Sequence, residues 1–277
     1  MQSKQSAPGL ASGASSDSRT ASSLETLAHL SLPDAFSSPV LLWSDQSFAL
    51  LQVQHQQADG HACLFTTATQ FSAAHILERL DRQVNFCRRL DASSHVPELV
   101  DVDLSAAQPW LLLGQIHGQP LTSWKSSSQA SIRSWLHLML AVTTAVESAH
   151  AVDLVLKSLS PGRIFYDPEQ GATLTDLSAA TLMPREIQDS PPNGALEYLA
   201  PEQTGRMVRG IDQRSDLYAL GCIAYEMLCG QPPFTSADPL ELIHAHLARQ
   251  PDFSIAAAGT PAIIISILAK LLAKEPA

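Results

Sequence analysis

Few side chains in this sequence stand in a pattern that could perform chemistry. Asp176, in the run Thr175-Asp176-Leu177-Ser178, is a carboxylate that could ligate a metal ion, although an aspartate in a strand-end turn is the plainer interpretation. Arg163 could hold a phosphate group, because a guanidinium offers two parallel N–H donors to phosphate oxygens. Neither residue alone predicts a reaction, because catalysis requires further reactive groups beside it.

The four cysteines form no metal-binding or disulfide pattern. Cys63, Cys87, Cys222 and Cys229 show no CxxC spacing and have no matching histidines. Cys222 and Cys229 lie in an apolar helical run, which is typical of buried free thiols. We therefore expect no disulfide and no zinc site, and a reducing cytoplasmic environment.

The composition indicates a globular protein and excludes two classes of partner. Of 277 residues, 45% are hydrophobic and 16% are charged. The net charge of −10 argues against nucleic acid and against anionic membranes, which require clustered Lys and Arg. The longest apolar run, Ala262 to Ala269, is too short to span a bilayer, so we expect no membrane insertion.

The elements that must position any site fall into two parts behind a leader. Residues 1–36 are rich in Ser and Ala, which predicts a disordered leader. Residues 37–113 combine one helical stretch, about Ser72 to Leu90, with four short strand-like runs. These runs are Val40–Trp43, Phe48–Val53, Ala62–Phe65 and Trp110–Leu113. A link at 114–122 joins this small sheet to a second part, 123–277.

The second part is mostly helical. An apolar stripe from Ile132 predicts a helix that ends near His150, and Ile164–Tyr166 with Thr173–Thr175 predicts a strand pair. A buried helix follows, with Ser215 as the expected N-cap and Gly230 at its C-terminal end.

Three motifs between Gly194 and Phe234 carry a resemblance to a known family. Ala200-Pro201-Glu202, the run Asp216-Leu217-Tyr218-Ala219-Leu220-Gly221, and Gly230-Gln231-Pro232-Pro233-Phe234 stand in the order and spacing of a protein kinase large lobe. The chain therefore resembles an α+β, two-lobed protein kinase-like fold with a small β-sheet lobe, a helical lobe and truncated C-terminal helices. The run APEQTGRMVRGIDQRSDLYALG is similar to the kinase-like domain that opens bacterial multi-domain sensor histidine kinases.

The resemblance implies phosphoryl transfer, but this sequence departs from the motifs in the small lobe. Kinases cover the phosphates with a Gly-rich loop and pair a strand Lys with a helix Glu. Here the corresponding turn reads Ser44-Asp45-Gln46-Ser47, with no glycine. No lysine occurs between Lys4 and Lys125. Thr66 stands at the expected Lys position and Gln83 at the expected Glu position.

The catalytic loop departs as well. In the run Leu156 to Arg163, Leu156 replaces the family's His, Ser158 replaces the catalytic base, and Arg163 replaces the metal-binding Asn. A guanidinium about 4 Å from Mg²⁺ would be repelled by up to roughly 8 kcal/mol at an effective dielectric constant of 20. Asp176 matches the retained metal ligand. We expect no firmly bound cofactor: Mg²⁺ is disfavoured, ATP stays open, and Asp176 and Arg163 are the candidate nucleotide-binding residues.

The retained residues are structural. Cys87, Leu156 and Leu177 match positions that form an apolar column through both lobes of kinases, and all three are apolar here. Asp216 is expected to accept backbone N–H groups from the former catalytic loop. The structural motif residues are Ala200, Pro201, Glu202, Asp216 and Gly221.

The C-terminal end raises a further expectation. In kinases the Glu of the Ala-Pro-Glu motif is buried against an Arg that follows later helices, and this chain stops at Ala277. We expect Glu202 to lack that partner, unless Arg206, Arg209 or Arg214 replaces it, and we expect the chain to be a fragment or truncated product.

These residues favour a catalytically impaired pseudokinase, a signalling or scaffold module of a bacterial sensor protein. Its partner would be another protein or its own downstream domains. The alternative is an active ATP-dependent Ser/Thr protein kinase with non-standard catalytic residues, in which Arg163 contacts phosphate in place of metal. A decaying gene product without function is a third interpretation.

Overall fold

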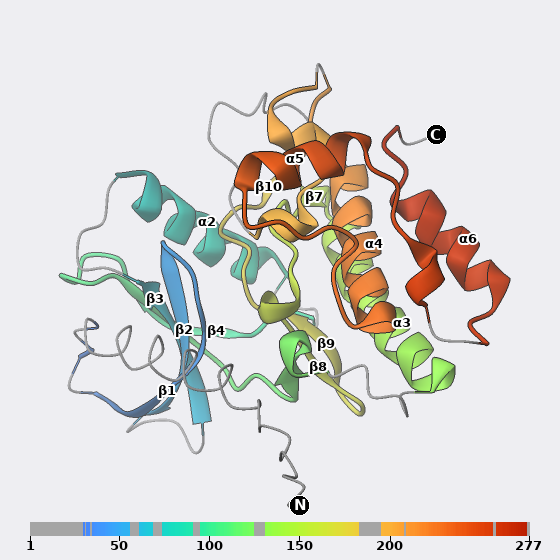
Figure 1. Cartoon of the computed structure of the whole chain (residues 1–277). Coiled ribbons are helices and arrows are strands. Elements are labelled where there is room, and N and C mark those ends of the chain that lie inside the picture. The colour runs from blue at the N-terminus through green and yellow to red at the C-terminus, as the bar shows by residue number, and fades with distance from the viewer. Residues whose placement is uncertain are drawn as a thin grey trace, which may run out of the picture.

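The computed structural model describes residues 30, 32–33, 35–55, 61–68, 74–90, 95–124, 131–182, 195–207, 209–256 and 259–275. These residues form a small lobe built on a sheet and a larger, mostly helical lobe (Figure 1). This arrangement confirms the predicted α+β fold of two lobes. Most of the expected leader lies outside the described residues, but Leu30 and Leu32 pack against the small lobe.

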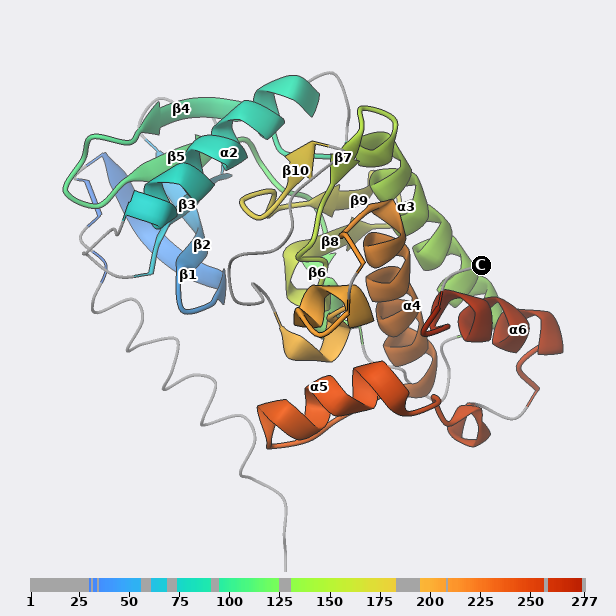
Figure 2. The ribbon, with the colours of Figure 1, turned by 90° about the horizontal axis from the view of Figure 1, so that it is seen from above.

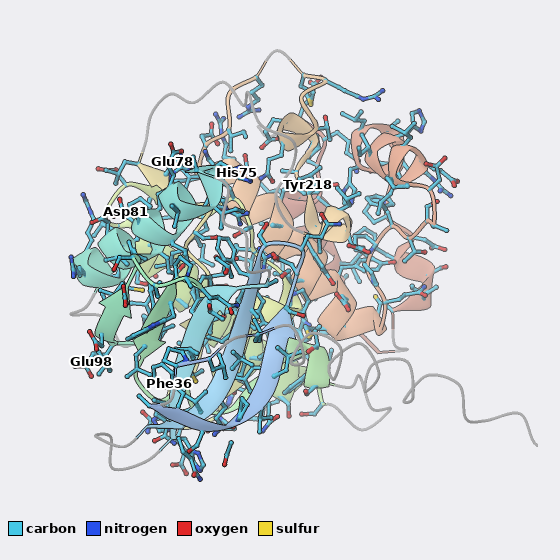
Figure 3. All side chains as sticks on the ribbon, turned by 90° about the vertical axis from the view of Figure 1, so that its left-hand side faces the viewer. Phe36, His75, Glu78, Asp81, Glu98 and Tyr218 are labelled. Carbon is cyan, nitrogen blue, oxygen red and sulfur yellow. The ribbon has the colours of Figure 1, made fainter. Side chains whose placement is uncertain are left out.

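The small lobe is a five-stranded antiparallel sheet with the strand order β1-β2-β3-β5-β4. Helix α2, Ala74–Leu90, lies across one face of it (Figure 2). Its exposed side carries His75, Glu78 and Asp81, which are labelled in Figure 3. The strands are β1 Phe36–Ser44, β2 Phe48–His55, β3 His61–Thr67, β4 Leu99–Asp103 and β5 Trp110–Leu113.

The two faces of the sheet bury different side chains, because neighbouring residues of a strand point to opposite faces. Cys63 and Phe65 of β3 belong to the main core together with Leu80 and Val84 of α2. Leu64 belongs to a separate cluster on the other face. The direction of each β3 side chain is therefore fixed by its position in this alternation.

The helical lobe is built around α3 and α4, which lie side by side in both ribbon views (Figures 1 and 2). Trp135 of α3 donates a hydrogen bond from Nε1 to the carbonyl of Ala224 in α4 at 3.1 Å. The helices are α3 Ile132–His150, α4 Gln213–Cys229, α5 Pro239–Ala248 and α6 Ala262–Leu271.

Short elements connect the two lobes and the helices. The short strands outside the five-stranded sheet are β6 Gln119–Pro120, β7 Leu154–Val155, β8 Ile164–Asp167, β9 Gly171–Leu174 and β10 Thr181–Leu182. The 3₁₀ turns are η1 Leu121–Ser123, η2 Pro161–Arg163, η3 Leu196–Tyr198, η4 Pro201–Thr204 and η5 Phe253–Ile255. Among the described residues, no helix is both long and apolar enough to cross a lipid bilayer.

Helix α4 corrects one predicted cap and confirms the other. The N-cap is Asp212, whose side chain accepts from the backbone N–H of Arg214, and the predicted Ser215 lies inside the first turn. Gly230 ends the helix with a φ of 81°, a left-handed conformation that glycine adopts without steric cost.

Gly221 permits close contact between α4 and α6. A Cβ atom at this position would lie 2.8 Å from Cβ of Leu271 and 3.2 Å from Cδ2 of Leu272. The first distance is below van der Waals contact, so any side chain would push the two helices apart.

We predict that Gly221→Ala destabilises the protein. Overpacking of a core costs about 1–3 kcal/mol, whereas the gain in helix propensity is about 1 kcal/mol. The free energy of unfolding, measured by urea denaturation, should fall. Gly210→Ala is the matched control, since a Cβ there meets no atom within 4 Å. Equal stability of the two variants would contradict this interpretation.

His246 of α5 is a buried histidine that packs against Phe234, the final residue of the motif Gly230–Phe234. Its ring is 0% exposed, and Nδ1 lies 3.0 Å from the hydroxyl of Tyr218. The Phe234 ring meets it edge-on, with centroids 5.1 Å apart. Burial, with a smaller contribution from the positive charge of Lys274, lowers the pKa of His246 to about 4.

This pKa predicts acid sensitivity. The unfolded chain, with an ordinary histidine pKa of about 6.5, binds more protons than the folded chain between pH 6.5 and pH 4. Stability should therefore fall as the pH drops through that window, by up to about 3 kcal/mol. His246→Gln should flatten the profile of unfolding free energy against pH, whereas the exposed control His137→Gln should leave it unchanged. Identical profiles for wild type and His246→Gln would refute this role.

Candidate functional site

A cavity of about 500 Å³ lies between the two lobes. It is bounded by the turn between β1 and β2, by α2, by η2 and by the start of η3. The lining residues are Trp43, Ser44, Asp45, Gln46, Ser47, Arg79, Ser160, Gly162, Arg163, Ala195 and Leu196. Both lobes therefore contribute charged side chains to one cavity.

The turn between β1 and β2 is held by its own side chain. Oδ1 of Asp45 accepts hydrogen bonds from the backbone N–H groups of Ser47 at 2.6 Å and Phe48 at 2.8 Å. The turn, Ser44-Asp45-Gln46-Ser47, contains no glycine. Its backbone donors therefore bind Asp45 instead of remaining free for an anionic ligand.

Arg163 joins the two lobes through ion pairs. Its guanidinium pairs with Oδ2 of Asp45 in the small lobe, and Nη1 lies 2.9 Å from Oδ2 of Asp176 in the helical lobe. The guanidinium also lies over the ring of Trp43, 5.3 Å from the ring centroid. Arg163 is only 7% exposed, so this charge is enclosed with its partners.

Asp176 is the sequence-predicted metal ligand, and the structure places it beside Arg163. Its Oδ1 accepts from the backbone N–H of Ser178 at 2.9 Å. Its Oδ2 faces Arg163 and has no hydrogen-bond partner of acceptable angle in the described part of the chain. The contact with Arg163 is therefore electrostatic, and it leaves this carboxylate oxygen beside a cation.

The donor set does not fit a divalent metal. Within the described ranges no group of three or more His, Cys, Asp or Glu residues could hold an ion by itself, and Mg²⁺ in phosphoryl-transfer sites needs only one or two carboxylates together with phosphate oxygens. Asp176 is the one predicted ligand, and a cation already pairs with it. An Mg²⁺ ion would have to displace the Arg163 guanidinium, because two cations about 4 Å apart repel strongly in a buried site.

Thr66 and Gln83 do not meet each other. Gln83 of α2 donates from Nε2 to the carbonyl of Thr175 at 3.3 Å and accepts from the backbone N–H of Leu177. The hydroxyl of Thr66 donates to the carbonyl of Pro109 at 2.8 Å. By strand alternation Thr66 shares the face of Leu64, and the β3 residue that faces α2 is Phe65, one position earlier.

The predicted position of the β3 lysine therefore moves by one residue, from Thr66 to Phe65. This correction does not restore an ion pair. Neither Phe65 nor Thr66 carries a charge, and the Gln83 amide is neutral. Gln83 instead holds α2 to the segment around Asp176.

Ser158, at the expected position of the base, has no activating neighbour. It is 5% exposed, and its hydroxyl has no hydrogen-bond partner in the described structure. A neutral hydroxyl with no base beside it cannot accept a proton near neutral pH.

Asp216 binds the loop that holds Ser158, as predicted. Its Oδ2 accepts from the backbone N–H of Leu156 at 2.8 Å, and its Oδ1 accepts from that of Lys157 at 2.8 Å. Nε2 of His150 lies 2.9 Å from Oδ2. Lys157 has a φ of 64°, an uncommon conformation for a residue other than glycine, and Asp216 stabilises it.

The remaining motif residues are also structural. Glu202 is 5% exposed and accepts from the hydroxyl of Ser215 at 2.6 Å. Within the described residues it makes no ion pair with Arg206, Arg209 or Arg214; the last two pair with Asp212. Cys87, Leu156 and Leu177 are all buried members of the main core, as expected for apolar residues at these positions.

Three residues that line this cavity were not predicted as site residues from the sequence. Asp45, Trp43 and Arg79 complete the cavity. Asp45 lies in the turn that the sequence marked by its lack of glycine, and Arg79 left a second signal. It lies four residues before Gln83 on the buried face of α2, at a position where an apolar residue would be ordinary.

The comparisons agree with this architecture. The model of the protein kinase domain matches residues 51–276, so the chain belongs to the protein kinase family.

The chain is 34% identical over 195 residues to the probable serine/threonine-protein kinase PknB of Bifidobacterium longum. It is 30% identical over 190 residues to the serine/threonine-protein kinase Pkn1 of Myxococcus xanthus. These matches cover 64% and 66% of this chain and 27% of each relative, so the chain spans about a quarter of their length.

A shorter match reaches a different kind of protein. Over 80 residues, 28% of this chain and 2% of the relative, it is 46% identical to the hybrid signal transduction histidine kinase G of Dictyostelium discoideum.

We predict that Asp216→Asn destabilises the fold by about 2–4 kcal/mol. An amide presents one acceptor and one donor, so one of the two backbone N–H groups would face an N–H group. The free energy of unfolding, from urea denaturation, measures the loss. Asp101→Asn is the control because Asp101 is exposed. A loss below about 0.5 kcal/mol would contradict the structural role of Asp216.

Proposed function

We propose that this chain is a pseudokinase, a kinase-fold module that signals or scaffolds without transferring phosphate. The observation that carries the proposal is the pairing of Arg163 with Asp176 and Asp45. A cation beside Asp176 supports the proposal, because metal-dependent phosphoryl transfer would require Mg²⁺ at that carboxylate.

The neighbouring groups support the same proposal. No described residue supplies a base at Ser158, and the small lobe presents neutral Phe65 and Gln83 where a charged pair would hold the nucleotide phosphates. A general base alone contributes about 10² to 10⁴ in rate, so loss of several such groups leaves little transfer activity.

A second candidate is an active ATP-dependent Ser/Thr protein kinase. The two long matches, both to serine/threonine-protein kinases, favour this candidate over the pseudokinase. In this candidate Arg163 would contact phosphate oxygens directly, which suits the geometry of a guanidinium.

The setting we propose is a bacterial sensor protein in the cytoplasm, in which the chain binds another protein or its own downstream domains. The partial match to a hybrid signal transduction histidine kinase supports the sensor setting. Four free cysteines, three of them buried, support a reducing compartment.

A transfer assay tests the proposal. We predict no incorporation of radiolabelled phosphate from ATP and Mg²⁺ into the chain itself or into a generic Ser/Thr protein substrate. Asp176→Ala serves as the site variant and Asp101→Ala as the control for loss of an exposed carboxylate. Transfer by wild type and Asp101→Ala that disappears in Asp176→Ala would establish the active kinase instead.

A further inference from the structure

Two arginines line the cavity between the lobes and are almost completely buried. Arg79 is 6% exposed and Arg163 is 7% exposed. Burial of a guanidinium is costly unless its N–H donors and its charge are compensated. The partners of each arginine therefore indicate whether the cavity is complete without a ligand.

Arg79 is compensated incompletely. Its Nη1 donates to the hydroxyl of Ser47 at 3.3 Å and its Nη2 to the hydroxyl of Ser178 at 3.0 Å, both neutral groups. Its Nε has no partner among the described residues. The guanidinium lies 4.5 Å from the centroid of the Phe48 ring. Burial lowers the pKa of Arg79, and the charges of Asp176 and Asp45 oppose this effect from a distance.

Asp45 and Asp176 differ in how firmly they are held. The side chain of Asp176 is 0% exposed and stays inside, whereas that of Asp45 is 30% exposed and borders solvent. With both carboxylates in place, two cations face two anions. If Asp45 turns toward water, two cations face one anion, and the cavity gains a net positive charge.

The lining suits a small oxyanion. Ser44, Ser47 and Ser160 place hydroxyl-bearing residues around the two guanidinium groups. No residue of the link between the lobes, 114–122, lines the cavity, so the ligand needs no group that reaches this link. A tetrahedral dianion can accept from both arginines at once, and guanidinium groups bind phosphate oxygens in pairs.

We infer that this cavity binds a terminal phosphoryl group, such as a phosphate monoester, without a metal ion. Arg79 and Arg163 hold the phosphate oxygens, and Asp45 is the built-in competitor that the ligand displaces. This inference rests on the proposed function, because an active kinase would fill the same space with nucleotide and metal. The phosphoryl group could belong to a phosphorylated side chain or to a nucleotide, and the experiment distinguishes these sources.

The experiment is isothermal titration calorimetry of the full chain in EDTA. The probes are O-phospho-L-serine, L-serine and ATP. We expect O-phospho-L-serine to bind with a dissociation constant of about 1 mM or tighter, and L-serine to give no heat. Loss of a charge-assisted bond should make Arg79→Gln bind about tenfold more weakly. Arg88→Gln, the same change at an exposed position of α2, should bind like wild type.

Asp45→Asn gives a gain of binding that a folding defect cannot imitate. Asn keeps the side-chain oxygen that accepts from Ser47 and Phe48 but removes the competing charge. We expect O-phospho-L-serine to bind several-fold more tightly. Thermal unfolding of every variant establishes that each is folded at the temperature of the titration.

The outcomes distinguish a phosphorylated side chain from a nucleotide as the ligand. They also test the phosphoryl-binding site separately from the proposed pseudokinase function. Tighter binding of O-phospho-L-serine than of ATP supports a phosphorylated side chain, and tighter ATP binding that Arg79→Gln weakens supports a nucleotide. The inference is overturned if O-phospho-L-serine gives no heat, or if Arg79→Gln and Arg88→Gln behave alike. Because the titration contains no metal, its failure would leave the transfer assay, and hence the proposed function, to be judged separately.

Discussion

The ion pairs of Arg163 are the interaction on which the arrangement of the cleft depends. This one guanidinium contacts Asp45 of the small lobe, Asp176 of the helical lobe and the face of Trp43. A buried cation of this kind is stable only while its partners stay in place. The turn between β1 and β2, the strand that precedes it and the segment after β9 are therefore held in one geometry.

The rest of the molecule is organised to keep that geometry. Trp43 donates from Nε1 to the hydroxyl of Thr175 at 3.1 Å, which is a second connection between the lobes. Gln83 binds the backbone on both sides of Asp176, and Asp216 fixes the loop before Arg163. In an active kinase the corresponding positions would hold nucleotide and metal. Here Arg163 pairs with Asp176 at the edge of an open cavity, an arrangement that supports the proposed role as a scaffold.

Long, strongly periodic elements could be predicted from the sequence. The helix expected from Ile132 to His150 has those bounds, and the helix expected from Ser72 begins at Ala74 within the described residues. Strand β4 was missed because Leu99–Asp103 contains two aspartates and lies at the edge of the sheet, where burial leaves a weaker pattern. The one-residue error at Thr66 has a similar cause, since only the pairing of β3 with its neighbours fixes which face a side chain joins.

The site was only half predictable, for a reason that lies in tertiary structure. The kinase motifs located Arg163 and Asp176, but Asp45 is 118 residues away from Arg163, and no local pattern connects the two. In the sequence, the only sign of Asp45 was the turn Ser44–Ser47 around it, which contains no glycine. The sequence could therefore predict which positions depart from the kinase motifs, but only the structure could show which side chains surround Arg163.

The most direct test of this account is electron paramagnetic resonance of Mn²⁺ with the chain and a non-hydrolysable ATP analogue. Mn²⁺ prefers the oxygen ligands that Mg²⁺ uses, and its free signal falls when it binds. The account predicts no protein-dependent loss of signal for wild type, and a loss for Arg163→Asn, in which Asp176 is released and an amide oxygen is added. Loss of signal with wild type, abolished by Asp176→Ala, would contradict the claim that Arg163 has taken the place of the metal.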